Sequence, residues 1–217
     1  MEKTALLLNE SFDTMPWDAV DTVVFDIGNV LLRFDPPYIL RTLFDDAKKH
    51  AVLMEKVFRS PYWIELDRGT LTYAQAARAM AQGDAQLEKD AAYLLEHWCS
   101  HKQVIEPGWA AARACAAHGK RLCLLSNYHR EAFEYNLAHH AIFSLFDVRL
   151  ISCYVHQLKP DAEIYDTLIH VSGLDPSRSV FLDDMLGNVQ AARQAGLHGF
   201  WVRSEQEMGA FFAGTNE

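Results

Sequence analysis

The sequence predicts an α/β fold: a three-layer, Rossmann-like core with a parallel sheet, and a helical subdomain inserted after the first strand. Short apolar runs alternate with helical patterns, which is typical of a parallel sheet with helical crossovers. The segment 36–103 interrupts this alternation with helical patterns alone. With 217 residues, half of them hydrophobic, the chain is long enough to bury a substantial core.

The first strand is expected at Val23–Asp26, where three apolar residues run into an aspartate and the chain turns on Ile-Gly-Asn. Short, unbroken apolar runs are typical of strands that are buried on both faces. Later runs of the same character predict further strands of this sheet, at 121–126, 148–152, 180–183 and 199–203.

Helical patterns separate these strands, at 109–118, 130–138, 162–172 and 187–195. Two of them end at a glycine, Gly119 and Gly196, as helix C-termini often do. Within 36–103, apolar residues also recur at helical spacing, and proline-containing turns open and close the segment at Pro36-Pro37 and Glu106-Pro107-Gly108. We therefore expect a core made of residues 1–35 and 104–217, and a helical cap at 36–103.

Ligands of open parallel sheets bind beyond the carboxyl ends of the strands, and this rule selects the candidate site residues. The predicted strands end at Asp26, at Ser126-Asn127 and at Asp183-Asp184, and a loop after the third strand leads to Lys159. These side chains suit phosphoryl transfer. A carboxylate can attack phosphorus, carboxylates can hold a divalent cation, and hydroxyl, amide and ammonium groups can bind phosphoryl oxygens.

Four segments resemble, in order, the four motifs of the haloacid dehalogenase-like hydrolase superfamily: FDIGNVL (25–31), LLSN (124–127), LKPDAEIY (158–165) and FLDDMLGNVQAARQAG (181–196). The resemblance covers roughly 20–35 and 105–203. The helical insert falls where capped members of that family carry their cap. Inside it, WIELDRGTLT (63–72) is similar to a recurring cap segment.

The resemblance implies a Mg²⁺-dependent phosphatase that acts on a small phosphorylated metabolite, and its motifs assign the roles. Asp26 matches the nucleophile, while Ser126 and Lys159 match the hydroxyl and the lysine of the second and third motifs. The Mg²⁺ ligands would be Asp26, the carbonyl of Gly28 and Asp184. Asp183 would stand behind them, oriented towards Lys159, and Asn188 occupies a position where many members have a second acidic residue. Asn127, Gly28 and Asn29 are expected beside the substrate, although Asn29 also suits a structural role in the turn.

Gly28 departs from the family pattern, because most phosphatases of this family have an aspartate two residues after the nucleophile. That aspartate protonates the leaving group and later activates water. A branch that includes sugar 1-phosphate phosphatases shares the Asp-x-Gly-Asn-Val start. In such an enzyme a metal-bound water, His129 or Asp35 would have to supply the proton.

Two other functions stay open at this point. A 2-haloacid dehalogenase needs no acid at this position, but dehalogenases of the family have a serine-rich fourth motif without the metal aspartate. A catalytically impaired phosphate-binding or regulatory module is the other alternative. Tyr62, Trp63 and Arg68 of the insert are further candidates for substrate contacts.

The composition limits the classes of binding partner that are expected. The chain has 20 basic and 29 acidic residues and a net charge of −9, which argues against binding to nucleic acid or anionic membranes. No CxxC pair occurs among the four cysteines, so reduced, buried thiols in the cytoplasm are expected. The first residues lack a signal-peptide pattern, no apolar run approaches the length of a membrane span, and 209–217 suggests a frayed tail. The oligomeric state is left open.

Overall fold

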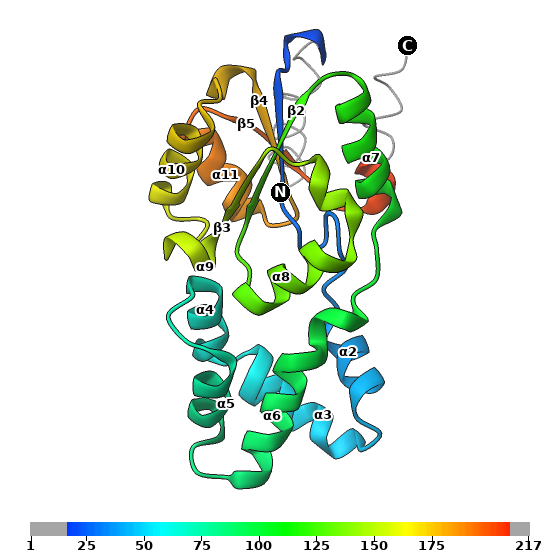
Figure 1. Cartoon of the computed structure of the whole chain (residues 1–217), viewed down its shortest axis with the longest axis vertical. Coiled ribbons are helices and arrows are strands. Elements are labelled where there is room, and N and C mark those ends of the chain that lie inside the picture. The colour runs from blue at the N-terminus through cyan, green and yellow to red at the C-terminus, as the bar shows by residue number, and fades with distance from the viewer. Residues whose placement is uncertain (1–16, 209–217) are drawn as a thin grey trace, which may run out of the picture.

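The computed structural model describes residues 17–208 and confirms the parallel sheet (Figure 1). Its five strands lie in the order β3-β2-β1-β4-β5, and every neighbouring pair is parallel. They are β1 (Thr22–Phe25), β2 (Arg121–Ser126), β3 (Val148–Ile151), β4 (Ser179–Asp183) and β5 (His198–Trp201). The expectations for the N-terminus and for the tail at 209–217 fall on residues outside the described range.

Both faces of the sheet are buried, which explains the unbroken apolar runs. Successive side chains of a strand point to opposite faces. In β1, Val23 and Phe25 accordingly join one hydrophobic cluster and Val24 joins the other. In β4, Val180 and Phe181 divide in the same way.

Helices form the outer layers of this core: α7 (Glu106–Ala117) and α8 (Arg130–His139) on one side, α10 (Ala162–Ser172) and α11 (Leu186–Gln194) on the other (Figure 1). The turn predicted at Glu106-Pro107-Gly108 is instead the first turn of α7. Proline is tolerated there because the first helical N–H groups have no intrahelical partner. Similarly, Ser152 begins the short helix α9 (Ser152–Val155) rather than ending β3.

Residues 36–101, called the helical insert below, contain no strand and lie beyond the carboxyl end of β1 (Figure 1). Side chains of Asp35, Ser60 and Thr72 accept backbone hydrogen bonds at the starts of three of its helices, as N-caps do. Its elements are α2 (Pro36–Leu43), α3 (Ala47–Leu53), the π-helix η2 (Met54–Phe58), α4 (Pro61–Arg68), α5 (Tyr73–Ala81), α6 (Ala85–His97) and η3 (Trp98–His101).

The end of α4 packs against α9 of the core, and this contact positions the insert over the sheet (Figure 1). Ser152 Oγ donates to the carbonyl oxygen of Asp67 at 2.5 Å, and His156 Nδ1 lies 2.9 Å from the carbonyl oxygen of Arg68. Gly69 ends the helix with φ +73°, a conformation that favours glycine. A Cβ atom at Gly69 would lie 2.2 Å from the carbonyl oxygen of Cys153, so no larger residue fits here without moving the backbone.

We expect Gly69→Ala to loosen this contact, and Gly83→Ala is its matched control. Both glycines have positive φ, but an added Cβ at Gly83 meets nothing within 4 Å. The control should therefore lose only the conformational term, about 1–2 kcal/mol. Gly69→Ala should lose about 1–3 kcal/mol more in urea unfolding because it overpacks the contact between α4 and α9. Equal losses for the two variants would contradict a tight contact at this point.

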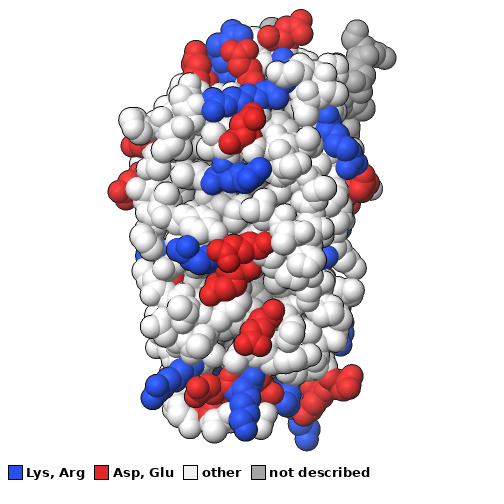
Figure 2. Space-filling view, viewed as in Figure 1, with Lys and Arg blue, Asp and Glu red and all other residues white. Residues whose placement is uncertain are grey.

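The remaining expectations concern the surface and the thiols. On the face shown in Figure 2, acidic and basic side chains alternate, and no broad basic patch forms there. All four cysteines are buried and free. None of the helices between residues 17 and 208 combines the length and the apolar character that crossing a bilayer requires.

Candidate active site

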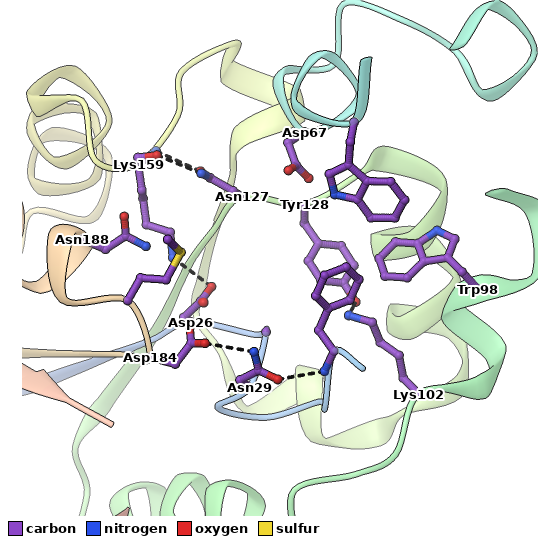
Figure 3. A pocket seen from close by; sticks show the side chains of 14 residues that line it. Asp26, Asn29, Asp67, Trp98, Lys102, Asn127, Tyr128, Lys159, Asp184 and Asn188 are labelled. Atoms are coloured by element: carbon purple, nitrogen blue, oxygen red, sulfur yellow. Dashed lines mark hydrogen bonds and ion pairs between the residues drawn. The ribbon is translucent and has the colours of Figure 1, made fainter. Parts of the chain in front are cut away.

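A cavity of about 220 Å³ lies at the carboxyl ends of the strands, between the core and the helical insert (Figure 3). Most of the residues predicted from the strand ends line it. The predicted residues in its wall are Asp26, Gly28, Asn29, Asn127, Lys159, Asp184 and Asn188, and the core also contributes Tyr128 and Met185. The other side of the cavity is formed by Phe34, by Trp63, Asp67 and Trp98 of the insert, and by Lys102 directly after it.

Lys159 lies at the centre of the core side. Its Nζ atom is 2.9 Å from Asp26 Oδ1 and 2.6 Å from Asp183 Oδ2, and its side chain is only 1% exposed. Burial alone would lower the pKa of Lys159, but the carboxylates of Asp183 and Asp26 outweigh it and hold that pKa above its ordinary value. Asn127 fixes the backbone of Lys159, because its amide donates to the Lys159 carbonyl and accepts from the Lys159 N–H, each at 2.9 Å.

Asp183 is buried behind this lysine, and both of its oxygens are already hydrogen-bonded. Besides Lys159, it accepts from the N–H of Met185 at 2.7 Å and from Asn188 Nδ2 at 3.0 Å. Such a carboxylate is held in place by protein donors on all sides. Its neighbour Asp184, unlike Asp183, lines the cavity.

Asn29 links Asp184 to the loop that follows β1 (Figure 3). Its amide nitrogen donates to Asp184 Oδ2 at 2.9 Å, and its amide oxygen accepts from the N–H of Phe34 at 2.9 Å. The backbone of Asn29 has φ +51°, which asparagine tolerates better than most residues. Asn29 therefore shapes the turn and orients a carboxylate at the same time.

The carboxylates at the carboxyl ends of β1 and β4 are suited to bind a divalent cation. Asp26, Asp183 and Asp184 each place one oxygen so that all three lie within 4.8 Å of one another. Hard oxygen donors of this kind are the ligands that Mg²⁺ prefers. Because protein donors already occupy Asp183, the residues suited to hold the ion are Asp26 and Asp184, with the carbonyl of Gly28 nearby in the cavity wall. Burial raises the pKa of Asp184, and the nearby charge of Asp26 adds to the shift.

The predicted catalytic hydroxyl and the two predicted proton-donating side chains do not line the cavity. Ser126 is buried, and its Oγ has no hydrogen-bond partner among the described residues. Asp35 is the N-cap of α2 and accepts from the N–H of Tyr38 at 2.9 Å. His129 is buried among the rings of Trp63, Tyr73 and Trp98. Burial, with the charge of Lys102, lowers the pKa of His129 to about 3, so its imidazole is neutral.

Asp67 is a cavity residue that the sequence analysis missed, although it lies within the cap-like segment 63–72. Its side chain is 17% exposed and its Oδ1 lies 3.4 Å from His129 Nε2. Burial raises the pKa of Asp67 to about 8; the charge of Asp26 adds to this rise and that of Lys102 opposes it. Of the three candidates in the insert, Trp63 lines the cavity, whereas Tyr62 and Arg68 do not.

Lys102 carries no sequence signal, because it follows the insert outside every motif. Its Nζ donates to the hydroxyl of Tyr128 at 2.8 Å and lies 4.5 Å from the ring centre of Trp98 and 5.1 Å from that of Phe34. Burial lowers the pKa of Lys102 to about 7, against the opposing charge of Asp26. A cation in an aromatic environment therefore faces the carboxylates across the cavity.

Comparison with known proteins agrees with this geometry. A family model of haloacid dehalogenase-like hydrolases matches residues 20–196, which include all four motifs and the insert. The chain belongs to this family. Membership establishes a haloacid dehalogenase-like hydrolase, but the family includes dehalogenases as well as other hydrolases.

Two curated relatives are distant. The chain is 29% identical over 150 residues to haloacid dehalogenase-like hydrolase domain-containing protein 3 of Homo sapiens, with 68% of this chain and 57% of the relative covered. It is 24% identical over 192 residues to the drimenol cyclase drtB of Aspergillus calidoustus, with 87% of this chain and 35% of the relative covered. The chain thus spans less than two thirds of either relative.

Solved structures share the fold. A HAD family enzyme of Bacteroides thetaiotaomicron, in complex with magnesium and inorganic phosphate, is 18% identical, with a TM-score of 0.63 and coverage of 84% of this chain and 93% of that one. The L-2-haloacid dehalogenase of Xanthobacter autotrophicus, with chloropropionic acid covalently bound, is 16% identical, with a TM-score of 0.64 and coverage of 87% and 80%. At such identities the likeness shows the fold alone.

Proposed function

We propose that this protein is a Mg²⁺-dependent phosphatase that hydrolyses a small phosphorylated metabolite through an aspartyl-phosphate on Asp26. The observation that carries the proposal is the arrangement of Lys159 against Asp26, with Asp184 beside them at the cavity wall. It combines a nucleophile, a fixed cation and a pair of carboxylates suited to Mg²⁺. The aspartate pair Asp183-Asp184 favours this function over dehalogenation, which needs no metal.

Asp26 would attack phosphorus in line with the ester oxygen, and the alcohol would leave on the opposite side. Lys159 and the side chain of Asn127 would neutralise or orient the phosphoryl oxygens, and Ser126, whose buried Oγ has no partner among the described residues, would assist them. Mg²⁺ held by Asp26, Asp184 and the Gly28 carbonyl would supply further charge neutralisation. Water then attacks the aspartyl-phosphate and regenerates Asp26.

We further propose that residues 36–103, the helical insert with the two residues after it, act as a cap over a core of residues 1–35 and 104–217. The insert's aromatic side chains Trp63 and Trp98 cover the cavity, which limits access of bulk water to the reaction. The cavity volume of about 220 Å³ restricts the substrate to a small molecule. Lys159 and Lys102 place two amino groups among the acidic side chains of the cavity, and together with Mg²⁺ they would bind an anionic substrate in a protein with a net charge of −9.

We also propose the cellular compartment in which the protein acts. All four cysteines are free, which fits a reducing compartment, and we place the protein in the cytoplasm. Nucleic acids and membranes are not expected as partners, because the net charge is −9 and the face in Figure 2 mixes both signs.

The experiment that tests the function is phosphate release from a panel of alkyl, sugar and aryl phosphates, measured with Mg²⁺ and with chelator. Asp26→Asn serves as the blank. Metal-dependent release that is absent from the blank would support the phosphatase, and the ranking of esters would identify the substrate class. Release from no ester would contradict it and favour a binding module, and turnover of a 2-halocarboxylate would favour the dehalogenase.

A further inference from the structure

We propose that Asp67 of the helical insert is the acid–base group of this enzyme and does the work of the aspartate that is missing at Gly28. The inference rests on the proposed phosphatase function and names a further catalytic residue for it. Four observations carry it: the room at Gly28, the other groups in the cavity, the placement of Asp67 opposite the nucleophile, and its environment.

The backbone does not require glycine at position 28. Gly28 is not among the glycines with positive φ, and an added Cβ would meet only Asp26 Oδ2, at 3.9 Å. A side chain would therefore fit beside the nucleophile, where a carboxyl group could serve as acid. The position carries no proton because its residue is glycine, so the proton has to come from a metal-bound water or from another side chain that reaches the cavity.

Few groups qualify. The ionisable side chains among the described residues that line the cavity are Asp26, Asp67, Lys102, Tyr128, Lys159 and Asp184. Asp26 is the nucleophile, Asp184 is suited to the metal, and Lys159 is bound to two carboxylates. Burial raises the pKa of Tyr128 well above its ordinary value, and its hydroxyl already accepts from Lys102 and Asn136. Asp67 and Lys102 remain.

Asp67 is on the side where the leaving group departs. In-line displacement puts the leaving oxygen opposite Asp26, and the insert covers the cavity from that direction. Figure 3 shows the carboxyl group of Asp67 pointing into the cavity. Its backbone is fixed, because Ser152 Oγ accepts from the N–H of Tyr128 at 3.0 Å and donates to the Asp67 carbonyl at 2.5 Å. One serine thus ties α4 to the loop that carries Asn127.

The surroundings of Asp67 favour the protonated form. The charged groups that face it are Asp26, Lys102 and Lys159, and the neighbouring His129 is neutral. Burial raises the pKa of Asp67 to about 8, so at neutral pH most molecules carry the proton that a leaving alkoxide needs. This acid form is lost as the pH rises through about 8. Lys102, by contrast, is enclosed by aromatic rings and bonded to Tyr128.

Asp67 loses one proton and regains one proton in each catalytic cycle. As the Asp26 oxygen bonds to phosphorus, the bond from phosphorus to the ester oxygen breaks, and that oxygen takes the proton of Asp67. The alcohol leaves, and Asp67 is a carboxylate. This carboxylate then accepts a proton from the water that attacks phosphorus, and the bond from phosphorus to Asp26 breaks. Inorganic phosphate is released, Asp26 is regenerated and Asp67 is protonated again.

The test compares leaving groups within each enzyme preparation, with Mg²⁺ present throughout. p-Nitrophenyl phosphate needs no acid, because its phenolate leaves unprotonated, whereas an alkyl phosphate does. For Asp67→Asn we expect kcat/KM on the best alkyl or sugar phosphate to fall by about 10²–10⁴-fold, and the aryl rate to fall much less. Partial unfolding lowers both rates equally, so their ratio stays informative. Glu65→Gln, an exposed position on the same helix, is the matched control and should keep the wild-type ratio.

Three further measurements sharpen the result. Wild-type activity on the alkyl ester should decline above about pH 8, the pKa of Asp67, and this decline should vanish in Asp67→Asn. Asp67→Asn/Gly28→Asp should regain part of the alkyl activity, because it restores a carboxyl group beside Asp26. Lys102→Met should keep the wild-type ratio if Asp67 is the acid.

An equal loss on both esters in Asp67→Asn, or a changed ratio in Lys102→Met alone, would overturn the assignment. Failure of the phosphatase function itself looks different. In that case the wild-type protein releases no phosphate from any ester, with or without Mg²⁺.

Discussion

Replacement of Asp26 by asparagine is expected to lower phosphate release by roughly four orders of magnitude or more, since no covalent intermediate can form. An amide oxygen is a poor nucleophile and a weaker metal ligand than a carboxylate. The fold should persist because the two side chains have the same shape, and Lys159 keeps its contact with Asp183 at 2.6 Å. Phosphate release with Mg²⁺ and the thermal unfolding midpoint are the two measurements.

The control for this prediction is a check for deamidation of the variant. Asparagine can deamidate to aspartate, so mass spectrometry of the Asp26→Asn preparation has to exclude the wild-type mass before the rate is interpreted. Turnover above about 1% of wild type in such a preparation would refute the nucleophile, since loss of the attacking group leaves only binding and electrostatic catalysis. Unfolding of the variant would instead show that Asp26 is required for the structure.

The second large effect is expected for Lys159→Met, which should abolish activity and lower the free energy of unfolding by about 3–5 kcal/mol. The lysine side chain is 1% exposed and lies between Asp26 and Asp183, which are both buried. Its removal leaves two carboxylates without their cation in a region of low dielectric constant. Urea unfolding at neutral pH measures the loss.

The loss of stability in Lys159→Met is expected to depend on pH, and the direction follows from the pKa of the buried carboxyl group. Burial raises the folded-state pKa of Asp183 above the unfolded value, and loss of the opposing Lys159 charge in Lys159→Met raises it further, so protonation of Asp183 favours the folded state. The stability deficit should therefore shrink as the pH falls. The double variant Lys159→Met/Asp183→Asn removes a lysine and one of its partners together and should recover much of the stability without activity. A single-variant loss below about 1 kcal/mol would contradict a coupled buried pair.

Much of the fold and part of the site follow from local patterns. The apolar run before Asp26 predicts a buried strand, and the residue after such a strand must lie at the carboxyl edge of a parallel sheet. The same reasoning brought Asn127, Lys159 and Asp184 to one rim, where the structure has them lining one cavity. These inferences succeed because strand direction and alternation are properties of a few consecutive residues.

Ser126 and the candidate proton donors show what local sequence patterns cannot predict. Ser126 ends its strand as expected, but it does not line the cavity, and its buried Oγ has no partner among the described residues. Asp35 and His129 lie close to motif residues along the chain. Nevertheless, the former caps a helix and the latter is buried among aromatic rings. Proximity in sequence does not specify where a side chain points.

The sequence by itself therefore determined the α/β core, the helical insert and the ends of the strands that carry the chemistry. Only the tertiary structure decided which side chains of the insert face the ends of these strands. Asp67 and Lys102 are separated from the core motifs along the chain. Asp67 reaches the cavity where α4 docks on α9 through Ser152, with Gly69 allowing the close approach, and Lys102 reaches it from the segment after η3, where it contacts Tyr128. Such docking depends on shape complementarity between distant segments, which no periodicity or local motif encodes.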